Sequence, residues 1–237
     1  MKQILFTIST FLISITSLAN NITVSNVKVV NQNTEMDYTN IKFDVSWENS
    51  WRTSTLESNW DAAWIFVKFR KKTEQNFYHA YLNNNGHTAP SGCVISPGLV
   101  NTKNSFNTVT NPAVGVFIHR DANGIGNVNF TDISIRWNYG ANGLADNDSV
   151  EICVYAIEMV YIPQGSFKLG DNFETSLSTN SRNFFHAGGG SITPFTVTSE
   201  NELTIGNVNN TQLWATAQQG VAGTLPANFP KGFAGFY

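Results

Sequence analysis

The sequence predicts a mostly β protein whose main domain is an antiparallel β-sandwich with jelly-roll or Greek-key-like connections. Three observations predict it: apolar residues recur with a period of two, Gly- and Asn-rich turns separate these segments, and the first 158 residues contain no long 3.6-residue apolar period. The composition agrees, because 41% of the residues are hydrophobic and only 13% are charged. A closed β-barrel is the alternative that these patterns leave open.

The first nineteen residues have the order of a secretory signal. Lys2 precedes an apolar stretch at positions 4–15, and small residues lead to Ala19 before Asn20. We expect residues 1–19 to be removed on export, which gives a periplasmic, cell-surface or secreted protein. No later segment reaches about 18 apolar residues, so no membrane span is expected.

The clearest strand covers residues 41–48, because its apolar and polar side chains alternate strictly. Residues 62–69, AAWIFVKF, are apolar nearly throughout, which is typical of a central strand covered on both sides. Residues 22–30 are expected to form a first strand. Its apolar positions change phase between Val24 and Val27, which indicates a β-bulge or a switch of face.

The second half of the sandwich is predicted in the same way. Residues 114–119 form a short apolar strand, and the Asn-Gly pair at 123–124 is typical of a hairpin turn between paired strands. Residues 131–137 alternate again, and 149–161 form a long strand. Beyond it the chain holds more Gly and Pro and few regular patterns, so a domain boundary is expected near Glu158.

Tryptophans supply the candidate ligand surface, since aromatic side chains on an exported β domain can stack on sugars. Trp47 and Trp64 fall within strand patterns, so burial in the core explains them. Trp51 and Trp60 lie in the polar segment between two strands and are the candidates for an exposed aromatic surface. Glycans or exported and cell-surface proteins are the partners that we consider.

The sequence gives little support for nucleic-acid binding, metal binding or catalysis. The net charge of −3 and the absence of a basic run argue against nucleic acid as a partner. Asp121 opens a stretch that resembles a calcium loop, but no closing Glu follows, so a plain turn is expected. The four His are too far apart in sequence to hold zinc from one element. We assign no catalytic, cofactor-binding or metal-binding residue.

Cys93 and Cys153 are the only cysteines in the chain. Export to an oxidising compartment permits a disulfide between them, which could contribute about 2–4 kcal/mol. Two separate buried thiols are the other interpretation, and Cys153 favours it by lying inside an apolar strand pattern. The sequence leaves both open.

Residues 159–170, MVYIPQGSFKLG, resemble the opening motif of the formylglycine-generating enzyme, or sulfatase-modifying-factor, family. Gln164 and Leu169 stand in place of the family's usual Gly and Met. Three further stretches resemble exported bacterial members that carry an extra N-terminal β domain, and they lie at 45–68, 135–161 and 195–237.

The resemblance implies that a β-sandwich of residues 20–158 precedes an incomplete first portion of an enzyme-like domain, residues 159–237, with a modified C-type-lectin fold. Catalytic relatives use a Cys pair in the C-terminal part of that domain, with copper and O₂, to oxidise a sulfatase Cys to formylglycine. Cys93 and Cys153 both precede the opening motif and do not match that pair. The resemblance therefore implies no catalytic residue and no copper site in this chain.

Two functional hypotheses follow. The leading one is the non-catalytic N-terminal region of an exported formylglycine-generating-enzyme-like protein, truncated before the catalytic half, with a role in recognition or scaffolding. The alternative is a self-contained surface module that binds glycans or proteins, with Trp51 and Trp60 as its ligand surface.

Overall fold

The computed structural model describes residues 20–99, 113–170, 186–190, 193–214 and 222–237, so the expected signal at 1–19 lies outside the described residues. The first body is built from eight strands and one short 3₁₀ helix. They are β1 (Thr23–Asn33), β2 (Tyr38–Arg52), β3 (Trp60–Lys71), β4 (Tyr78–His79), β5 (Cys93–Leu99), β6 (Ala113–Arg120), β7 (Gly124–Trp137), η1 (Gly140–Asn142) and β8 (Val150–Tyr161).

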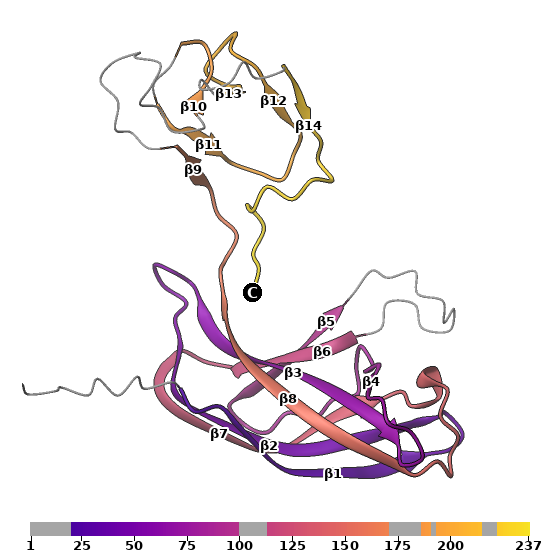
Figure 1. Ribbon diagram of the computed structural model, residues 1–237. Coiled ribbons are helices and arrows are strands. Elements are labelled where there is room, and N and C mark those ends of the chain that lie inside the picture. The colour runs from indigo at the N-terminus through magenta and orange to yellow at the C-terminus, as the bar shows by residue number, and fades with distance from the viewer. Residues whose placement is uncertain (1–19, 100–112, 171–185, 191–192, 215–221) are drawn as a thin grey trace, which may run out of the picture.

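These strands form a curled antiparallel sheet that folds over on itself as two layers (Figure 1). In the first layer β2 lies between β1 and β7. In the second layer β3 lies between β8 and β6, and β5 pairs with the other side of β6. The layers join where Arg52 of β2 pairs with Trp60 of β3. The mostly β, antiparallel sandwich predicted from the sequence is confirmed.

The core lies between the layers and consists of alternate residues of the central strands. In β2 every second side chain from Ile41 to Trp47 is at most 1% exposed, as the period of two predicts. The other strands supply the facing residues, which include Ala63, Ile65, Val67, Val116, Ile118, Ile133, Ile135 and Trp137. Removal of these apolar surfaces from water is the main force that holds the layers together.

Of the register shifts in the first layer, two bear on the strands predicted from the sequence. The predicted change of phase in the first strand is confirmed, because the register of β1 on β2 shifts at Asn26, whose φ is 56°. A second bulge in β7 places Asp132 at a φ of 62° and leaves Thr131 exposed while Ile133 is buried. The expectation that 131–137 alternates without interruption is therefore wrong at Thr131.

The turn after β6 does not close a hairpin, although the Asn-Gly pair at 123–124 predicted one. β6 pairs with β3 and β5, whereas β7 pairs with β2 in the other layer. The turn therefore carries the chain between layers. An Asn-Gly pair indicates a local reversal, but the partner of each strand depends on which apolar surface it can cover.

The strand β3 is central, as predicted, but only its core-facing side chains are fully buried by other strands. Its inward residues are buried, whereas Trp64 and Phe66 on the outer side are half-buried. The interpretation of Trp64 as a core residue is thus wrong, while that of Trp47 is confirmed at 1% exposure. On one side of β3, β8 continues to Tyr161, past the boundary expected near Glu158.

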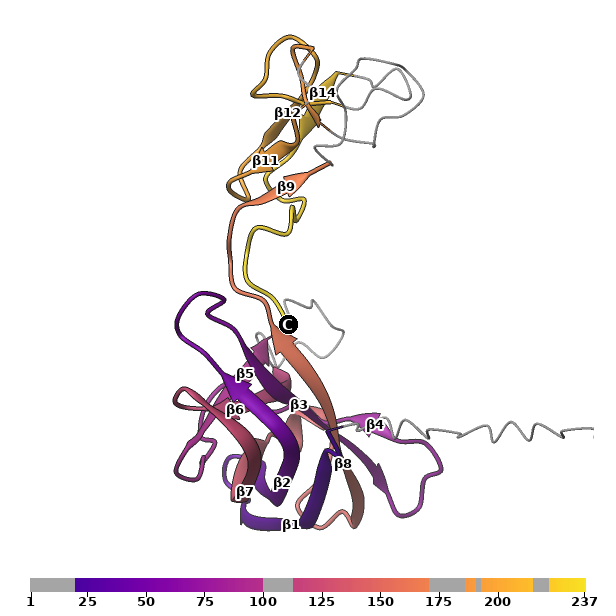
Figure 2. The ribbon, with the colours of Figure 1, turned by 90° about the vertical axis from the view of Figure 1, so that its left-hand side faces the viewer.

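Beyond β8 the chain forms a small second body of short strands (Figures 1 and 2). They are β9 (Phe167–Leu169), β10 (His186–Ala187), β11 (Phe195–Val197), β12 (Leu203–Ile205), β13 (Leu213–Trp214) and β14 (Gly223–Leu225). β9 pairs with β11, and the other four form a second sheet. After β14 the chain returns to the sandwich, where Phe236 bridges to Ile162.

Candidate functional site

The structure does not bring Trp51 and Trp60 together as one ligand surface. Trp51 lies opposite Ile125 of β7, and Trp60 lies opposite Tyr161 of β8; both indoles are half-buried. Arg52, the residue after Trp51, places its guanidinium over the Trp60 ring. Because consecutive strand residues project to opposite faces, Trp51 projects away from Trp60.

Both faces of the Trp60 ring are occupied. Tyr161 stacks on the indole with ring centroids 4.1 Å apart, and the guanidinium carbon of Arg52 lies 4.3 Å from the ring centroid. Two such groups can share one flat ring only from opposite sides. The indole N–H at the ring edge donates a 2.9 Å hydrogen bond to the hydroxyl of Tyr237. A sugar could stack on Trp60 only if Tyr161 or Arg52 moved.

Trp60 belongs to a larger surface on the outer side of the second layer, which we call the aromatic face. It consists of Trp60, Trp64 and Phe66 of β3, Phe117 of β6, and Tyr155 and Tyr161 of β8. The antiparallel register assembles it, because the outward residues of β3 stand beside the outward residues of β6 and β8. The rings of Phe66 and Tyr155 stack at 5.1 Å, and those of Trp64 and Phe117 lie 4.5 Å apart.

A pair of glycines makes room for the largest ring of this face. Gly98 of β5 and Gly115 of β6 are cross-strand partners. A Cβ atom would lie 2.3 Å from the Trp64 indole at Gly98 and 2.4 Å from it at Gly115. Without side chains at these two positions, the indole can pack directly against the backbone of β5 and β6.

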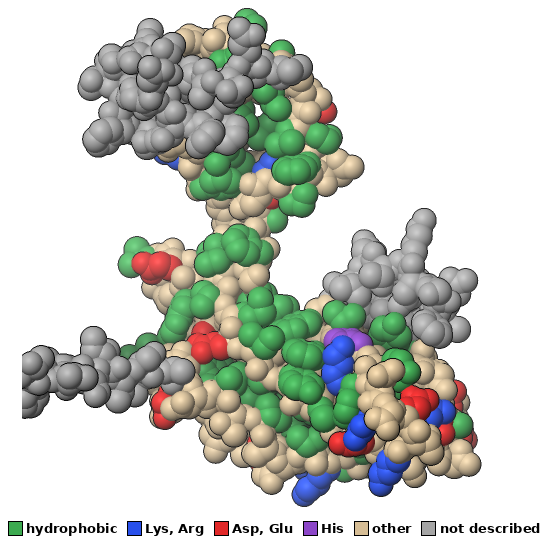
Figure 3. All heavy atoms as spheres, in the orientation of Figure 1, with side chains coloured by type: hydrophobic (Ala, Val, Ile, Leu, Met, Phe, Trp, Pro, Cys, Tyr) green, Lys and Arg blue, Asp and Glu red, His purple; other side chains and the backbone are tan. Residues whose placement is uncertain are grey.

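One end of the aromatic face is open to solvent. Tyr155, at this end, is 46% exposed, and Ile157, the next outward residue of β8, is 52% exposed. Figure 3 shows hydrophobic side chains gathered over this part of the sandwich, beneath the second body. A contiguous exposed apolar patch of this kind marks an interaction site more often than scattered apolar residues do.

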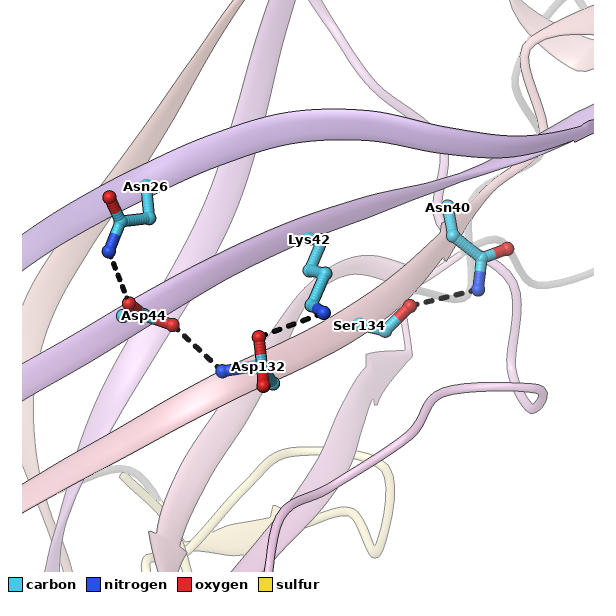
Figure 4. A network of polar contacts seen from close by, with 6 residues as sticks. All are labelled: Asn26, Asn40, Lys42, Asp44, Asp132 and Ser134. Carbon is cyan, nitrogen blue, oxygen red and sulfur yellow. Dashed lines mark hydrogen bonds and ion pairs between the residues drawn. The ribbon is translucent and has the colours of Figure 1, made fainter.

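The outer side of the first layer is polar around Asp44, in contrast to the aromatic face, although Ile125 at the start of β7 is 87% exposed. Figure 4 shows Asn26, Lys42, Asp44 and Asp132 joined across β1, β2 and β7. Asn26 donates a 2.6 Å hydrogen bond to Asp44, which also accepts one of 2.7 Å from the backbone N–H of Asp132. The hydrogen bond from Asn26 is the main reason why the pKa of Asp44 is lowered. This layer thus has the solvated outer face typical of antiparallel sheets.

A buried carboxylate anchors the end of the sandwich behind Trp60. Asp61 is 0% exposed and accepts hydrogen bonds from the Trp47 indole N–H at 2.5 Å, the Ser50 hydroxyl at 2.9 Å and the Trp51 backbone N–H at 2.9 Å. Its acceptor capacity is used within the fold. We therefore assign Asp61 a structural role rather than a catalytic one.

His119 lies on the Trp60 side of the same end. It is 5% exposed, and its Nδ1 lies 2.9 Å from Nη1 of Arg52 and 2.8 Å from the carbonyl oxygen of Arg120. Burial lowers the pKa of His119, with Arg52 acting in the same direction. A neutral imidazole held by these neighbours completes the packing around Trp60.

The two cysteines are free thiols at opposite edges of the second layer. Cys93 lies in β5, and burial raises the pKa of its thiol to about 12. Cys153 is half-buried in β8, beside Lys68 of β3. A cysteine acts as a nucleophile or metal ligand through its thiolate, which the environment of Cys93 strongly disfavours.

In the ranges that the structure describes, no three His, Cys, Asp or Glu side chains gather closely enough to hold a metal ion. Those ranges also contain no helix that is both long and apolar enough to cross a bilayer.

Sequence reasoning identified Trp60 but missed the rest of the aromatic face. Residues 62–69 carry two interleaved apolar sets, with Ile65 and Val67 facing the core and Trp64 and Phe66 facing outward. That pattern indicates that the outer face of β3 is apolar. It does not indicate whether other elements of the fold pack on that face. Comparison of the chain with protein-family models, curated proteins and solved structures finds no match.

Proposed function

We propose that this chain is a non-catalytic β module of an exported formylglycine-generating-enzyme-like protein, and that it acts in recognition or scaffolding by docking an exported or cell-surface protein on its aromatic face. The observation that carries the docking role is the contrast between the two outer faces of the sandwich. The family and the export route are supported by the resemblance of residues 159–170 and by the signal pattern of residues 1–19.

Solvent exposure is the first support for docking. Tyr155 and Ile157 keep about half of their surface in water, at 46% and 52%. Covering apolar surface gains roughly 25 cal/mol for each Å² removed from water, so a partner that covers these side chains gains affinity. The outer side of the first layer around Asp44 offers no comparable gain, because Lys42, Asp44 and Asp132 already bind one another there.

The kind of side chain favours a protein over a glycan. Ile157 is branched and aliphatic, and it lies beside Trp64 across the pairing of β3 with β8. Aliphatic groups beside aromatic rings are typical of protein interfaces, whereas sugar stacking needs a flat ring with a free face. Trp60 has neither face free. The glycan alternative therefore depends on Trp51 alone.

The thiols support the non-catalytic part of the proposal. An oxidase of the family's kind needs two reactive cysteines close together, whereas Cys93 and Cys153 lie on the two edge strands of one layer. Incubation of the chain with a sulfatase peptide, copper and O₂ should yield no aldehyde on the peptide Cys. Aldehyde formation, measured by mass spectrometry, would overturn the assignment.

Docking is tested with variants of the two outer faces. The variant Tyr155→Ser with Ile157→Ser makes the open end of the aromatic face polar, and Lys42→Ser with Ser134→Ala is the matched double change on the polar face. Each protein is cross-linked to a fraction of exported and cell-surface proteins, and the cross-linked partner is quantified. We expect the polar-face variant to capture the same partner as the unmodified chain and the aromatic-face variant to capture at least tenfold less.

Two results would contradict docking of a protein on this face. One is equal capture by both variants, which would place the contact elsewhere. The other is binding to a glycan array that is lost in Trp51→Ala but kept in the aromatic-face variant, which would favour the sugar-binding alternative. Circular dichroism of both variants checks that the sandwich remains folded.

A further inference from the structure

A slot at the other end of the aromatic face receives the chain segment that returns from the second body. We propose that Trp60, Phe117 and Tyr161 form a binding site for a phenol ring, that the chain fills this site with its own Tyr237, and that the tyrosine side chain of another polypeptide can take its place. This inference is independent of the docking proposed at the open end near Tyr155.

The contacts of Tyr237 match the chemistry of a phenol. Its ring stacks on Phe117 with centroids 3.8 Å apart and planes 10° apart, and it lies 5.2 Å from the ring of Tyr161. Its hydroxyl accepts the 2.9 Å hydrogen bond from the Trp60 indole N–H. A stacking surface combined with a donor aimed at the para oxygen suits a tyrosine, whereas a phenylalanine satisfies only the stacking part.

The walls of the slot are held by groups other than Tyr237. Trp60 is fixed between Tyr161 and Arg52, and Phe117 rests against Trp64 at 4.5 Å. Trp64 in turn packs on the glycine pair of β5 and β6. Because these supports belong to the sandwich, we expect the slot to keep its shape when the phenol ring leaves. Sites formed in advance of binding lose less free energy to ordering.

The segment that carries Tyr237 is anchored at its base, where Glu200 accepts hydrogen bonds from the backbone N–H groups of Lys231, Phe233 and Ala234, and it makes fewer contacts toward its end. Phe229 and Phe236 are 54% and 53% exposed. Near the sandwich the backbone makes two hydrogen bonds between Ile162 and Phe236, of 2.7 and 2.9 Å. Segments with few buried contacts open at low free-energy cost, so exchange of the ring is feasible. Burial raises the pKa of Tyr237, in agreement with a ring inserted among other side chains.

Replacement of Tyr237 with a small residue should leave an empty slot that accepts a free phenol. The test uses the full chain with Tyr237→Ala, and p-cresol, which is the tyrosine side chain as a separate molecule. Binding is followed through the NMR signal of the Trp60 indole N–H, which is assigned with Trp60→Phe. Tyr78→Ala, which removes a 48% exposed tyrosine from β4, is the matched control.

We expect p-cresol to shift the Trp60 indole signal in Tyr237→Ala with an affinity at least tenfold higher than in the unmodified chain or in Tyr78→Ala. In those two proteins the tethered Tyr237 competes at an effective concentration of about millimolar or more. Toluene should bind Tyr237→Ala about fivefold more weakly than p-cresol, because it offers no acceptor to the indole N–H.

Three outcomes would overturn the inference. They are equal p-cresol binding in all three proteins, toluene binding as tight as p-cresol, and no shift of the Trp60 signal in Tyr237→Ala. Tyr237→Phe gives a second readout that does not need an added ligand. It keeps the ring but removes the acceptor, so hydrogen exchange of the Trp60 indole N–H should accelerate by about fivefold or more. Unchanged exchange would exclude the hydrogen bond that defines the site.

Discussion

The Asp61 carboxylate is a charged group with 0% exposure, and three donors from β2 hold it in place. A carboxylate so far from water is tolerated because its oxygens are hydrogen-bonded. The same donors would be left buried without an acceptor if the carboxylate were removed. Removal of the Asp61 carboxylate should therefore destabilise the fold mainly because buried donors would be left without an acceptor.

Asp61→Ala should lower the free energy of unfolding by about 3–5 kcal/mol, because the Trp47 indole, the Ser50 hydroxyl and the Trp51 N–H lose their shared acceptor. Urea denaturation followed by fluorescence measures the change. Glu151→Ala, which removes a surface ion pair with Arg70, is the control and should cost less than about 1 kcal/mol. Similar losses in the two variants would show that Asp61 is not an anchor.

The two thiols should differ in reactivity. Burial raises the pKa of Cys93 to about 12, so almost none of it is thiolate at pH 8, whereas Cys153 is only half-buried. Iodoacetamide should therefore alkylate Cys153 on the order of 100-fold faster than Cys93 in the folded chain. Mass spectrometry of tryptic peptides gives both rates. In urea the difference should vanish, and its persistence there would mean that burial is not the cause.

At the scale of elements, the packing of β3 on β5 and β6 depends on two residues that have no side chain. A Cβ atom at Gly115 would lie 2.4 Å from the Trp64 indole and 2.6 Å from the carbonyl oxygen of Ile65. The indole could shift, but the carbonyl belongs to the neighbouring strand. Space at Gly115 is therefore a condition for the pairing of β3 with β6.

Gly115→Ala should destabilise the sandwich by about 1–3 kcal/mol, because the added methyl group overlaps the backbone of β3. Thermal unfolding followed by circular dichroism at 217 nm, the usual β-sheet band, measures the effect as a lower melting temperature. Gly165→Ala provides the control, since no atom lies within 4 Å of a Cβ at that position. A melting temperature of Gly115→Ala equal to that of the control would refute the close packing.

For the whole molecule, stability should depend on pH through three imidazoles, of which His119 is buried and His79 and His87 are half-buried. Desolvation is the main reason why the pKa values of His79, His87 and His119 are lowered. In the unfolded chain each imidazole titrates near its ordinary pKa of about 6.5. Below that pH the unfolded state therefore binds more protons than the folded state, and protonation favours unfolding.

The free energy of unfolding should be nearly constant between about pH 7 and 7.5 and should decrease as the pH falls below about 6.5. Urea titrations between pH 7.5 and 5 measure it. The lowered pKa values of Asp44, Asp148 and Glu200 affect stability mainly below about pH 5, so the imidazoles dominate this window. His119→Gln removes one of the three titrating groups and should reduce the slope. A free energy of unfolding that stays constant, or that increases, as the pH falls from about 7 to 5 would contradict the lowered pKa values of these imidazoles.

Much of the fold could be predicted because its signals are local. The strand around Ile41–Trp47 and the bulge near Asn26 follow from the order of neighbouring residues, since side-chain direction alternates along any extended chain. The same local logic failed at the Asn-Gly pair at 123–124. There the reversal is encoded locally, but the strands on either side join different layers.

By itself the sequence determined where the strands run and which side chains they turn to each face. The sequence could not determine which sheet face remains exposed to solvent, or which residues far apart in the chain contact each other. The outer side of β3 becomes an aromatic face only through its register with β6 and β8, and Tyr237 reaches Trp60 only because the chain returns from the second body. Alternation within a strand depends on adjacent residues, whereas pairing and coverage depend on the competition of all apolar surfaces for burial, which the tertiary structure alone decides.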